Sequence, residues 1–328
     1  MTGWRQVATL LDRHLPRRAS GIGHLGNPRH LTTTISIYPT EKELRYRRIH
    51  SVADRRIIYD FGSNNGDDIP YYLLKSDIVI AVEANPDLCA TIRNRFANEI
   101  SEGRLIVVNC VLTDDASRTE TPFYIHTTHN VLSQLPKPTE NLDAFREVCL
   151  PCATAGSIVE KYGPPLYVKI DIEHFDGPIL RDLLTHSIFP PYISAESHDI
   201  SVFAMLVALG GYDAFKLVDG LSVPQVYSRR NLAANGGKVS YSFPPHSAGP
   251  FGEDIDGQWM TANAFLKVLA FEGLGWKDVH ATNRVAADPS ITPAEWNYCH
   301  RVVNETMKTR LSWPLHQIFS ILARLTNR

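Results

Sequence analysis

The sequence predicts an α/β fold built on a doubly wound, mostly parallel sheet. Strand and helix signals alternate from Ile57 onward, which is typical of a parallel sheet covered by helices. The polar, glycine-rich segment YDFGSNNGDD, residues 59–68, follows a short apolar run, as a strand-to-helix turn does. The 328 residues, 44% of them hydrophobic, suffice for one large domain with additions. We therefore expect a single decorated α/β domain.

The first part of the predicted sheet comes from three short runs of β-branched and apolar residues. Strands are expected at 57–62, 78–83 and 104–111. Helices are expected between them, at 66–75 and 86–100. Short strands separated by helix-length segments are typical of β-α-β units with parallel strands.

The second part of the predicted sheet repeats this alternation. An edge hairpin is expected at 123–129, in FYIHTTH, and a helix near 155–162. Strands are expected at 166–171 and 192–197, with a helix at 177–185 between them and another that begins near Ser201.

The chain divides into four predicted segments. We expect an N-terminal extension at 1–56, the α/β core at 57–224, a lid-like irregular segment at 225–260 and a C-terminal helical addition at 261–328. Residues 225–257 are rich in Gly, Pro, Ser and Asn, and such stretches are usually a functional lid or disordered. The addition is expected to hold two or three helices. The amphipathic face of the last one favours a core or dimer contact, so a homo-oligomer is one expectation.

Composition and charge exclude several classes of protein. The 33 Lys and Arg residues nearly balance 35 Asp and Glu residues, and no run of basic residues predicts a nucleic-acid partner. No apolar stretch is long enough for a transmembrane helix, so we expect a soluble, cytoplasmic protein. Five cysteines without a framework spacing suit a reducing compartment. Cys149 and Cys152 form a lone CxxC pair, which is weak evidence for zinc.

The loop after the first predicted strand is the first place to look for a ligand. In open α/β sheets, ligands bind beyond the carboxyl ends of the strands. Gly62 and Gly66 would let the backbone approach a bound molecule, and the helix that follows offers free N–H groups. A dinucleotide fingerprint has the spacing G-x-G-x-x-G, whereas three other residues separate these two glycines. The spacing therefore argues against a pyrophosphate.

Two acidic residues at predicted strand ends favour a different cofactor. Asp60 precedes the glycine loop, where a carboxylate would repel a pyrophosphate but suit a cationic amino group. Glu83 ends the second strand and can accept hydrogen bonds from both hydroxyls of a ribose. Together they favour S-adenosylmethionine over NAD. The alternative is that both acids only cap the following helices.

Three motifs carry a resemblance to a known family. DFGSNNG, VEANP and VKIDIEHFDGPIL resemble motifs of the FkbM-like methyltransferases, class I enzymes that transfer a methyl group from S-adenosylmethionine to hydroxyl oxygens of sugars and macrolides. The resemblance covers roughly residues 57–220 and implies a Rossmann-like methyltransferase sheet. It implies cofactor binding by Asp60, Gly62, Asn64, Gly66, Glu83 and Asn85. The family usually has Gly where this chain has His174, so we expect the turn after that strand to be altered.

The acceptor side is predicted from two other strand ends. Asp171 ends one strand, with Glu173, His174 and Asp176 just beyond it. Glu196, His198 and Asp199 follow the neighbouring strand.

Three of these residues are the predicted catalytic set: His198, Asp171 and Glu196. We expect His198 to act as the general base, because an imidazole titrates near neutral pH, and Asp171 or Glu196 to orient it. In a less favoured alternative, the three residues bind a divalent cation such as Mg²⁺. A further alternative is that some of these acids cap the helices that begin near Gly177 and Ser201.

The functional hypothesis is an S-adenosylmethionine-dependent O-methyltransferase. The expected acceptor is a hydroxyl group on a small molecule or glycan, above all on a sugar of a glycan, glycolipid or glycosylated natural product. An NAD(P)-dependent oxidoreductase is one alternative, which the missing G-x-G-x-x-G disfavours. A non-catalytic adenosyl-binding or scaffold protein is the other.

Overall fold

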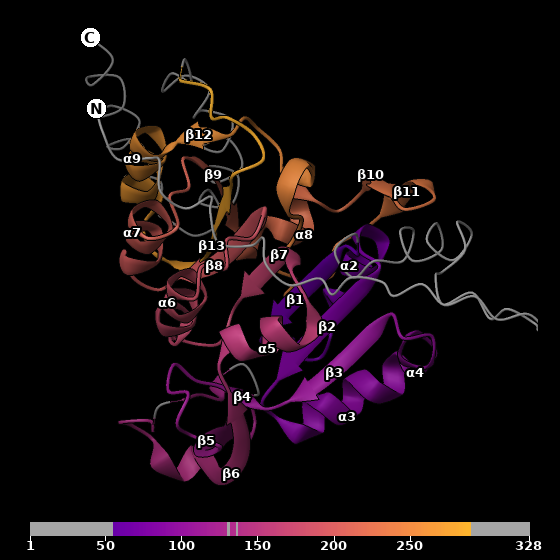
Figure 1. Cartoon of the computed structure of the whole chain (residues 1–328), viewed down its shortest axis with the longest axis vertical. Helices are drawn as coiled ribbons and strands as arrows, with labels where there is room; N and C mark the ends of the chain where they lie inside the picture. Colours follow the sequence, from indigo (N-terminus) through magenta and orange to yellow (C-terminus); the bar gives the residue numbers. More distant parts are fainter. Residues whose placement is uncertain (1–54, 130–131, 136, 290–328) are drawn as a thin grey trace, which may run out of the picture. The chain divides into compact units, whose positions relative to one another are not determined.

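The computed structural model describes residues 55–129, 132–135 and 137–289 (Figure 1). Its centre is an eight-stranded sheet in the order β12-β9-β13-β8-β7-β1-β2-β3. The strands that pair in parallel are β1 (Ile57–Phe61), β2 (Ile78–Glu83), β3 (Leu105–Asn109), β7 (Pro165–Ile170) and β8 (Tyr192–Ser197). Strand β9 (Ala214–Asp219) runs in the same direction as β8, because both pair antiparallel with β13. The mostly parallel sheet predicted from the sequence is thus confirmed.

Helices cover both faces of this sheet. They are α2 (Ile69–Lys75), α3 (Pro86–Arg95), α4 (Ala97–Ser101), α5 (Ala155–Tyr162), α6 (Asp176–Thr185), α7 (Ser201–Ala208), α8 (Val223–Val226) and α9 (Ala262–Glu272). Successive side chains of β1 alternate between two hydrophobic clusters, with Ile57 and Tyr59 in one and Ile58 in the other. A strand buried on both sides explains the continuous apolar run IIY, and the fold is doubly wound as predicted.

The predicted edge hairpin at 123–129 is wrong, because most of these residues belong to one strand. Strand β5 (Glu120–His126) pairs antiparallel with β6 (Phe145–Ala153), and β4 (Val111–Leu112) joins β6 to make a separate three-stranded sheet. The local pattern of alternating residues predicts a strand but carries no information about a partner some 20 residues away. The short 3₁₀ helix η3 (Leu142–Ala144) leads into β6.

The C-terminal addition contributes strands as well as a helix, which corrects the prediction of helices alone. Strand β13 (Gly275–Thr282) lies antiparallel between β8 and β9, and the two-residue β12 (Met260–Thr261) pairs with β9. The main sheet therefore extends beyond the predicted core boundary at residue 224. The remaining predicted helices of the addition, and nearly all of the N-terminal extension, lie outside the described residues.

The segment expected to be an irregular lid is largely packed against the core. Strands β10 (Arg230–Ala234) and β11 (Gly237–Tyr241) form an antiparallel hairpin, and the 3₁₀ helices η4 (Gly220–Ser222) and η5 (Gly252–Asp254) flank this region. The Phe251 ring stacks on Tyr167 of β7 with 4.1 Å between ring centroids. The Ser247 hydroxyl donates a hydrogen bond to the buried Asp68 carboxylate. The hairpin corrects the prediction that the segment is irregular, whereas a lid function stays a prediction.

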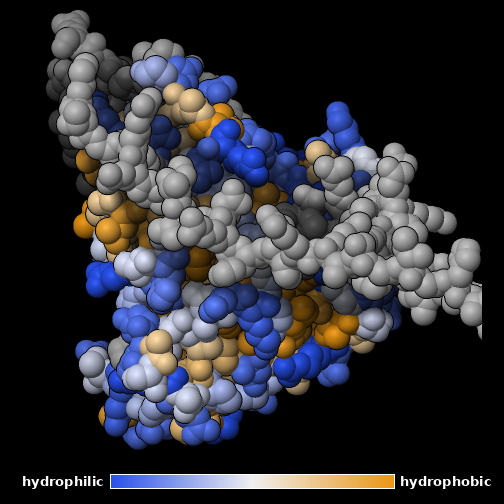
Figure 2. All heavy atoms as spheres, viewed as in Figure 1, coloured by the Kyte–Doolittle hydropathy of each residue, from blue (hydrophilic) through white to orange (hydrophobic). Residues whose placement is uncertain are grey.

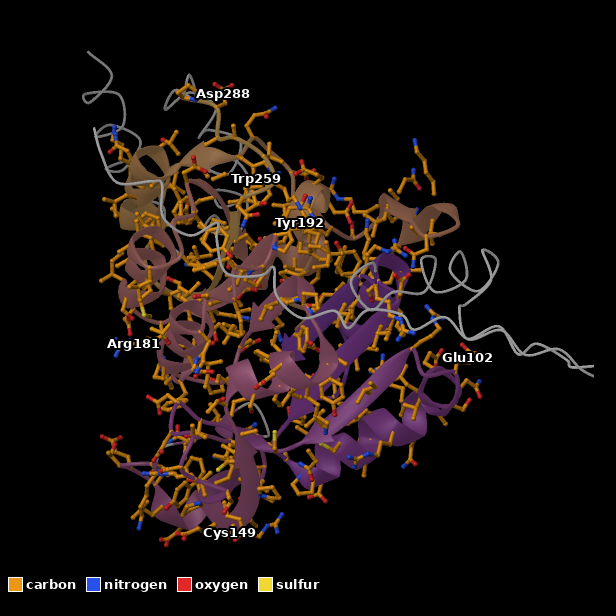
Figure 3. The ribbon with its side chains drawn as sticks, viewed as in Figure 1. Glu102, Cys149, Arg181, Tyr192, Trp259 and Asp288 are labelled. Carbon is orange, nitrogen blue, oxygen red and sulfur yellow. The ribbon has the colours of Figure 1, made fainter. Side chains whose placement is uncertain are left out.

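The surface of the described residues carries both hydrophilic and hydrophobic side chains. Figure 2 shows hydrophilic residues over much of this face, with hydrophobic ones interspersed among them. No helix in the described part of the chain has the length and apolar character needed to cross a membrane. Cys149 and Cys152 lie on β6, Cys149 exposed (Figure 3), and neither belongs to a group of three or more clustered metal-ligand side chains among the described residues.

Candidate active site

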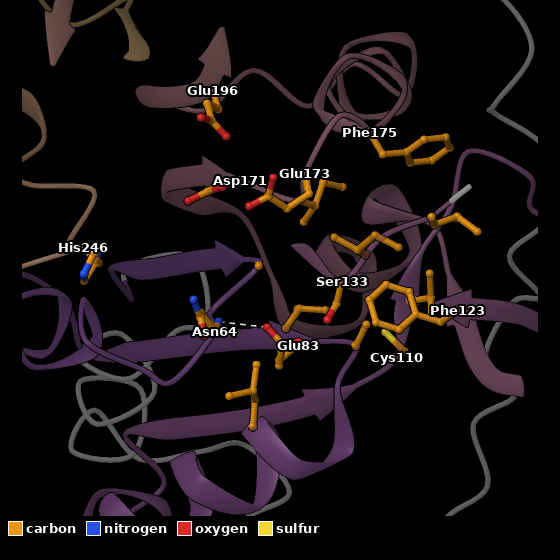
Figure 4. A pocket seen from close by; sticks show the side chains of 18 of the residues that line it. Asn64, Glu83, Cys110, Phe123, Ser133, Asp171, Glu173, Phe175, Glu196 and His246 are labelled. Carbon is orange, nitrogen blue, oxygen red and sulfur yellow. Dashed lines mark hydrogen bonds between the residues drawn. The ribbon is translucent and has the colours of Figure 1, made fainter. Parts of the chain in front are cut away.

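A cavity of about 340 Å³ opens at the carboxyl ends of the central strands. Figure 4 shows side chains from β2, from the loops after β1 and β7 and from the end of β8 pointing into the same space. This is the edge of a parallel sheet at which ligands are expected to bind. The cavity therefore joins the two groups of strand ends that the sequence singles out.

Gly62 occupies a position that no other residue can take. Its φ is +87°, and a Cβ at this position would lie 1.8 Å from the carbonyl oxygen of Asp171. The N–H groups of Gly62 and Ser63 both donate to the carbonyl oxygen of Val82, at 2.9 and 3.1 Å. The glycine thus lets the loop after β1 pass directly between β2 and β7, and it lines the cavity.

The other loop residues divide between lining the cavity and supporting it. Asn64, with a φ of +48°, lines the cavity. Gly66 is buried away from it, and a Cβ there would press against Ile69 and Phe96 at 3.0 Å. Gly66 therefore permits the packing of the loop on α2 and α3, and its predicted contact with a cofactor is not supported.

Glu83 lines the cavity and holds the glycine loop in place. One carboxylate oxygen accepts from the backbone N–H of Asn64 at 2.8 Å, the bond drawn in Figure 4, and the other from the N–H of Asn85 at 2.7 Å. Burial raises the pKa of Glu83 to about 7, although these two N–H groups oppose the rise. Each oxygen keeps a lone pair for a ligand hydroxyl.

Asn85 has a structural role in this arrangement. Its side chain accepts a hydrogen bond from the N–H of Asp87 at 3.0 Å and so caps α3. Asn85 is almost fully buried and does not line the cavity. The cofactor contact predicted for it is therefore not supported.

Asp60 pairs with the protein itself and does not reach the cavity. The Lys169 ammonium lies 3.4 Å from an Asp60 oxygen and 3.2 Å from an Asp171 oxygen, and it donates to the Gly62 carbonyl at 3.1 Å. Burial lowers the pKa of Lys169, but the neighbouring carboxylates, Asp171 first and then Asp60, outweigh it and raise this pKa well above its usual value. The charged lysine takes the place of the ligand amino group that the sequence assigned to Asp60.

Lys169 is thus a residue of the site that the sequence analysis missed. A lysine within the apolar run LYVKI is an unusual residue for a fully buried strand, and this was the signal available. A lysine almost never becomes fully buried without a partner, and here two carboxylates at strand ends supply it.

Three carboxyl groups converge at the end of the cavity next to β7 and β8. Figure 4 shows Asp171, Glu173 and Glu196 directed toward one another from the ends of β7 and β8. Burial, with the nearby charges of Asp171 and Glu196, raises the pKa of Glu173 to about 8. Burial also raises the pKa of Glu196. The expectation that these strand ends meet is confirmed by their common lining of one cavity.

His198 lies next to Glu196 and outside the cavity lining. Its Nε2 atom lies 2.9 Å from a carboxylate oxygen of Glu196, and His198 does not line the cavity. The Glu196 side chain raises the pKa of His198 to about 9, although burial opposes the rise. The role of His198 as the general base stays a prediction.

The turn after β7 has an unusual backbone. Glu173 and His174 are consecutive residues with φ values of +52° and +68°, a conformation that favours glycine. The His174 ring lies beside the His198 ring, with 4.1 Å between the centroids. The turn thus keeps a glycine-favouring conformation although a histidine occupies it.

Distant segments supply the remaining walls. Phe123 of β5 and Phe175 line one end of the cavity (Figure 4). His246 and Trp276 line it as well, and their rings are stacked with 5.9 Å between the centroids. Sequence analysis did not identify these aromatic residues as one group, because they come from segments that only the fold brings together.

Comparisons with known proteins add a set of similar structures. No family model matches the sequence, and no curated protein sequence matches it. The chain is similar to the methyltransferase FkbM from Methylobacillus flagellatus KT, at 13% identity and a TM-score of 0.34, over 50% of this chain and 39% of that one. This structure represents the family that the sequence motifs resemble.

Two further structures are similar over most of their lengths. One is the O-methyltransferase from Bacillus cereus in complex with SAH, at 9% identity and a TM-score of 0.32, over 76% of this chain and 84% of that one. The other is precorrin 8W decarboxylase from Methanobacterium thermoautotrophicum, at 13% identity and a TM-score of 0.31, over 75% and 92%. At such values the similarity carries no argument about activity, which rests on the residues of the cavity.

Proposed function

We propose that this protein is an S-adenosylmethionine-dependent methyltransferase that acts on a hydroxyl oxygen. The observation that carries the proposal is the set of acidic side chains that line the cavity. Its described lining includes four carboxyl side chains, those of Glu83, Asp171, Glu173 and Glu196, and neither lysine nor arginine. These carboxyl groups can ionise beside a ligand with a sulfonium and an ammonium group, whereas the described lining offers no lysine or arginine to the pyrophosphate of NAD.

The cofactor is expected to occupy the half of the cavity formed by the ends of β1 and β2. Glu83 has lone pairs available for the two ribose hydroxyls, and the bare backbone at Gly62 permits close approach. Leu88, Val111 and Leu112 add apolar surface that suits the flat face of an adenine ring. The positively charged end of the ligand would then lie toward Asp171 and Glu173.

The acceptor is expected to occupy the other half, between the carboxyl groups and the aromatic residues. When bound, S-adenosylmethionine supplies the methyl group, which the acceptor oxygen takes up as the bond to sulfur breaks. The protein aligns the hydroxyl for this in-line displacement, and alignment alone can contribute roughly 7–11 kcal/mol. Asp171 or Glu196, which line the cavity, takes the proton that the hydroxyl releases.

A sugar is the acceptor that we favour within this class. Phe123, Phe175 and Trp276 line the cavity and offer flat apolar surfaces, while the carboxyl groups offer hydrogen-bond acceptors for several hydroxyls. A sugar ring combines an apolar face with a rim of hydroxyl groups. The sugar would belong to a glycan, a glycolipid or a glycosylated natural product.

Calorimetry with two ligands tests the cofactor assignment. S-adenosylhomocysteine should bind the purified protein with a measurable heat, whereas NAD should not bind. Methyl transfer from labelled S-adenosylmethionine to a carbohydrate-containing extract should then identify the acceptor class. Binding of NAD without binding of S-adenosylhomocysteine would contradict the proposal and favour an oxidoreductase. Tight binding without any transfer would favour a non-catalytic adenosyl-binding protein.

A further inference from the structure

Two histidines and a glutamate form a compact group at the acceptor end of the cavity. We propose that Glu173, His174 and His198 bind a divalent transition-metal ion such as Zn²⁺ or Co²⁺. One carboxylate oxygen of Glu173 and one ring nitrogen from each histidine lie within 4.8 Å of one another. Among the residues that the structure describes, this is the one group of three or more potential ligands that meets this distance.

The three candidate ligand atoms lie slightly farther apart than the ligand atoms around a bound metal ion. Ligand atoms about 2.1 Å from a tetrahedral ion lie about 3.4 Å from each other. The three candidate atoms therefore need to approach by no more than about 1.4 Å, which rotation of flexible side chains provides. His174 is exposed to solvent, so an ion has a path to the group.

Neighbouring carboxyl groups support this arrangement. A carboxylate oxygen of Glu196 lies 2.9 Å from the Nε2 atom of His198, at the edge of the proposed site. A carboxylate behind a histidine ligand orients the ring and makes it a stronger ligand. Asp176, at the start of α6, is 2% exposed, and its Oδ2 atom has no hydrogen-bond partner. Several carboxyl groups thus meet at this place, and a bound cation would offset their charge.

The ligand types favour a transition metal over magnesium. Imidazole nitrogens suit Zn²⁺, Co²⁺, Ni²⁺ and Fe²⁺, whereas Mg²⁺ prefers oxygen ligands and water. The group also differs from the magnesium site considered from the sequence, which consisted of Asp171, Glu196 and His198. Only His198 is common to the two sets. Glu196 was a ligand in the magnesium site, whereas here it contacts a ligand, His198.

The position of the site suggests what the ion does. Glu173 lines the cavity beside Asp171, at the end where the acceptor is expected. A metal ion there would bind an acceptor oxygen and lower the pKa of its hydroxyl. This role rests on the proposed function, whereas binding of the ion by the three side chains does not.

Titration with Co²⁺ tests the site without an activity assay. The full-length protein is treated with a chelator, dialysed and titrated with Co²⁺, and visible absorption and calorimetry are recorded. We expect one equivalent to bind with an absorption band typical of nitrogen and oxygen ligands. Excess Mg²⁺ should leave this band unchanged. Absence of saturable binding, or displacement of Co²⁺ by Mg²⁺, would overturn the proposal.

Three variants and one control locate the ion. Glu173→Gln, His174→Asn and His198→Asn should each weaken Co²⁺ binding at least about 10-fold. Asparagine is chosen at 174 because it tolerates a positive φ. The control is His129→Ala, since His129 and His126 form another histidine pair, with 5.4 Å between centroids. Equal weakening in the control, or unchanged binding in all three variants, would show that Co²⁺ binds elsewhere.

Binding of S-adenosylhomocysteine, measured on the same samples, separates this proposal from the proposed function. It also shows that each variant is folded. Protein that binds Co²⁺ at the group but not S-adenosylhomocysteine supports the metal site and contradicts the methyltransferase. Protein that binds S-adenosylhomocysteine but not Co²⁺ contradicts the metal site alone.

Discussion

The two halves of the cavity are built in different ways. Gly62, Asn64 and Glu83 form the proposed cofactor half from one turn and the end of the adjacent strand. The acceptor half combines residues as far apart as Phe123 and Trp276. The first half depends on backbone geometry that a short motif specifies. The second depends on strand pairing across the whole sheet.

Gly62 is the point at which the two halves touch, and its replacement should have the largest effect. Gly62→Ala places a Cβ 1.8 Å from the Asp171 carbonyl oxygen in a backbone conformation with positive φ. We expect a loss of more than about 4 kcal/mol in the free energy of unfolding. Gly103→Ala is the matched control, because Gly103 also has a positive φ, of +70°, but no atom within 4 Å of the added Cβ.

Urea denaturation of both variants measures the difference. The control should lose only about 1 kcal/mol, the cost of the backbone conformation alone. Similar losses in the two variants would show that the close approach to Asp171 is unimportant and that the halves are independent at this point.

Lys169 links the halves through charge, and its removal should have the next largest effect. Lys169→Met leaves the buried Asp60 without its ion pair, at a cost of roughly 3 kcal/mol. The double variant Lys169→Met, Asp60→Asn should recover part of the loss, as thermal unfolding will show.

A variant of Asp60 distinguishes the two roles considered for this residue, the ion pair with Lys169 and contact with a ligand. Asp60→Asn alone should reduce stability while leaving the affinity for S-adenosylhomocysteine close to its original value. A stable Asp60→Asn protein with greatly weakened ligand binding would restore the role that the sequence suggested, contact with the ligand's amino group.

Replacement of Glu83 should weaken ligand binding in the cofactor half of the cavity. Glu83→Gln weakens hydrogen bonds to the ribose hydroxyls, because a neutral amide replaces the carboxylate, and should cost about 1.5–3 kcal/mol in binding of S-adenosylhomocysteine. Calorimetry measures this loss, and Asn85→Ser serves as the control, since serine keeps the cap of α3. A Glu83→Gln protein with full affinity would remove Glu83 from the ribose site.

The smallest expected effect is the pH dependence of this binding. The pKa of Glu83 in the free protein is raised to about 7, mainly by burial, and the ionised form is the better hydrogen-bond acceptor. Affinity should therefore rise between pH 6 and pH 8, by up to about 10-fold, as the proton is lost. Since the ligand also titrates, the rise in the original protein is compared with that in Glu83→Gln. An equal rise in both would assign the effect to the ligand.

Local patterns allowed much of the sheet and part of the site to be predicted. Short apolar runs identified β1, β2, β7 and β8, because strands buried on both faces need continuous apolar residues. Gly62 and Glu83 can be identified from the sequence, because a glycine in a tight turn and an acid at a strand end are recognisable from a few neighbouring residues. Both line the cavity, and their contact with a cofactor stays a prediction.

Other predictions depended on partners that the local sequence does not specify. Asp60 was assigned to a ligand because the burial of Lys169 beside it becomes visible only when β1 and β7 pair. The partner of β5 and the strand β13 were missed for the same reason, since antiparallel pairing joins segments far apart in the chain.

By itself, the sequence determined the α/β class, the place of the ligand loop and the acidic character of the strand ends, because short-range periodicity and turn chemistry encode them. Only the tertiary structure decided which carboxyl group faces the cavity and which is neutralised within the core. It also decided that Glu173, His174 and His198 lie together. The reason is physical: the charge and accessibility of a side chain depend on what packs around it, and strands from distant parts of the chain supply those neighbours.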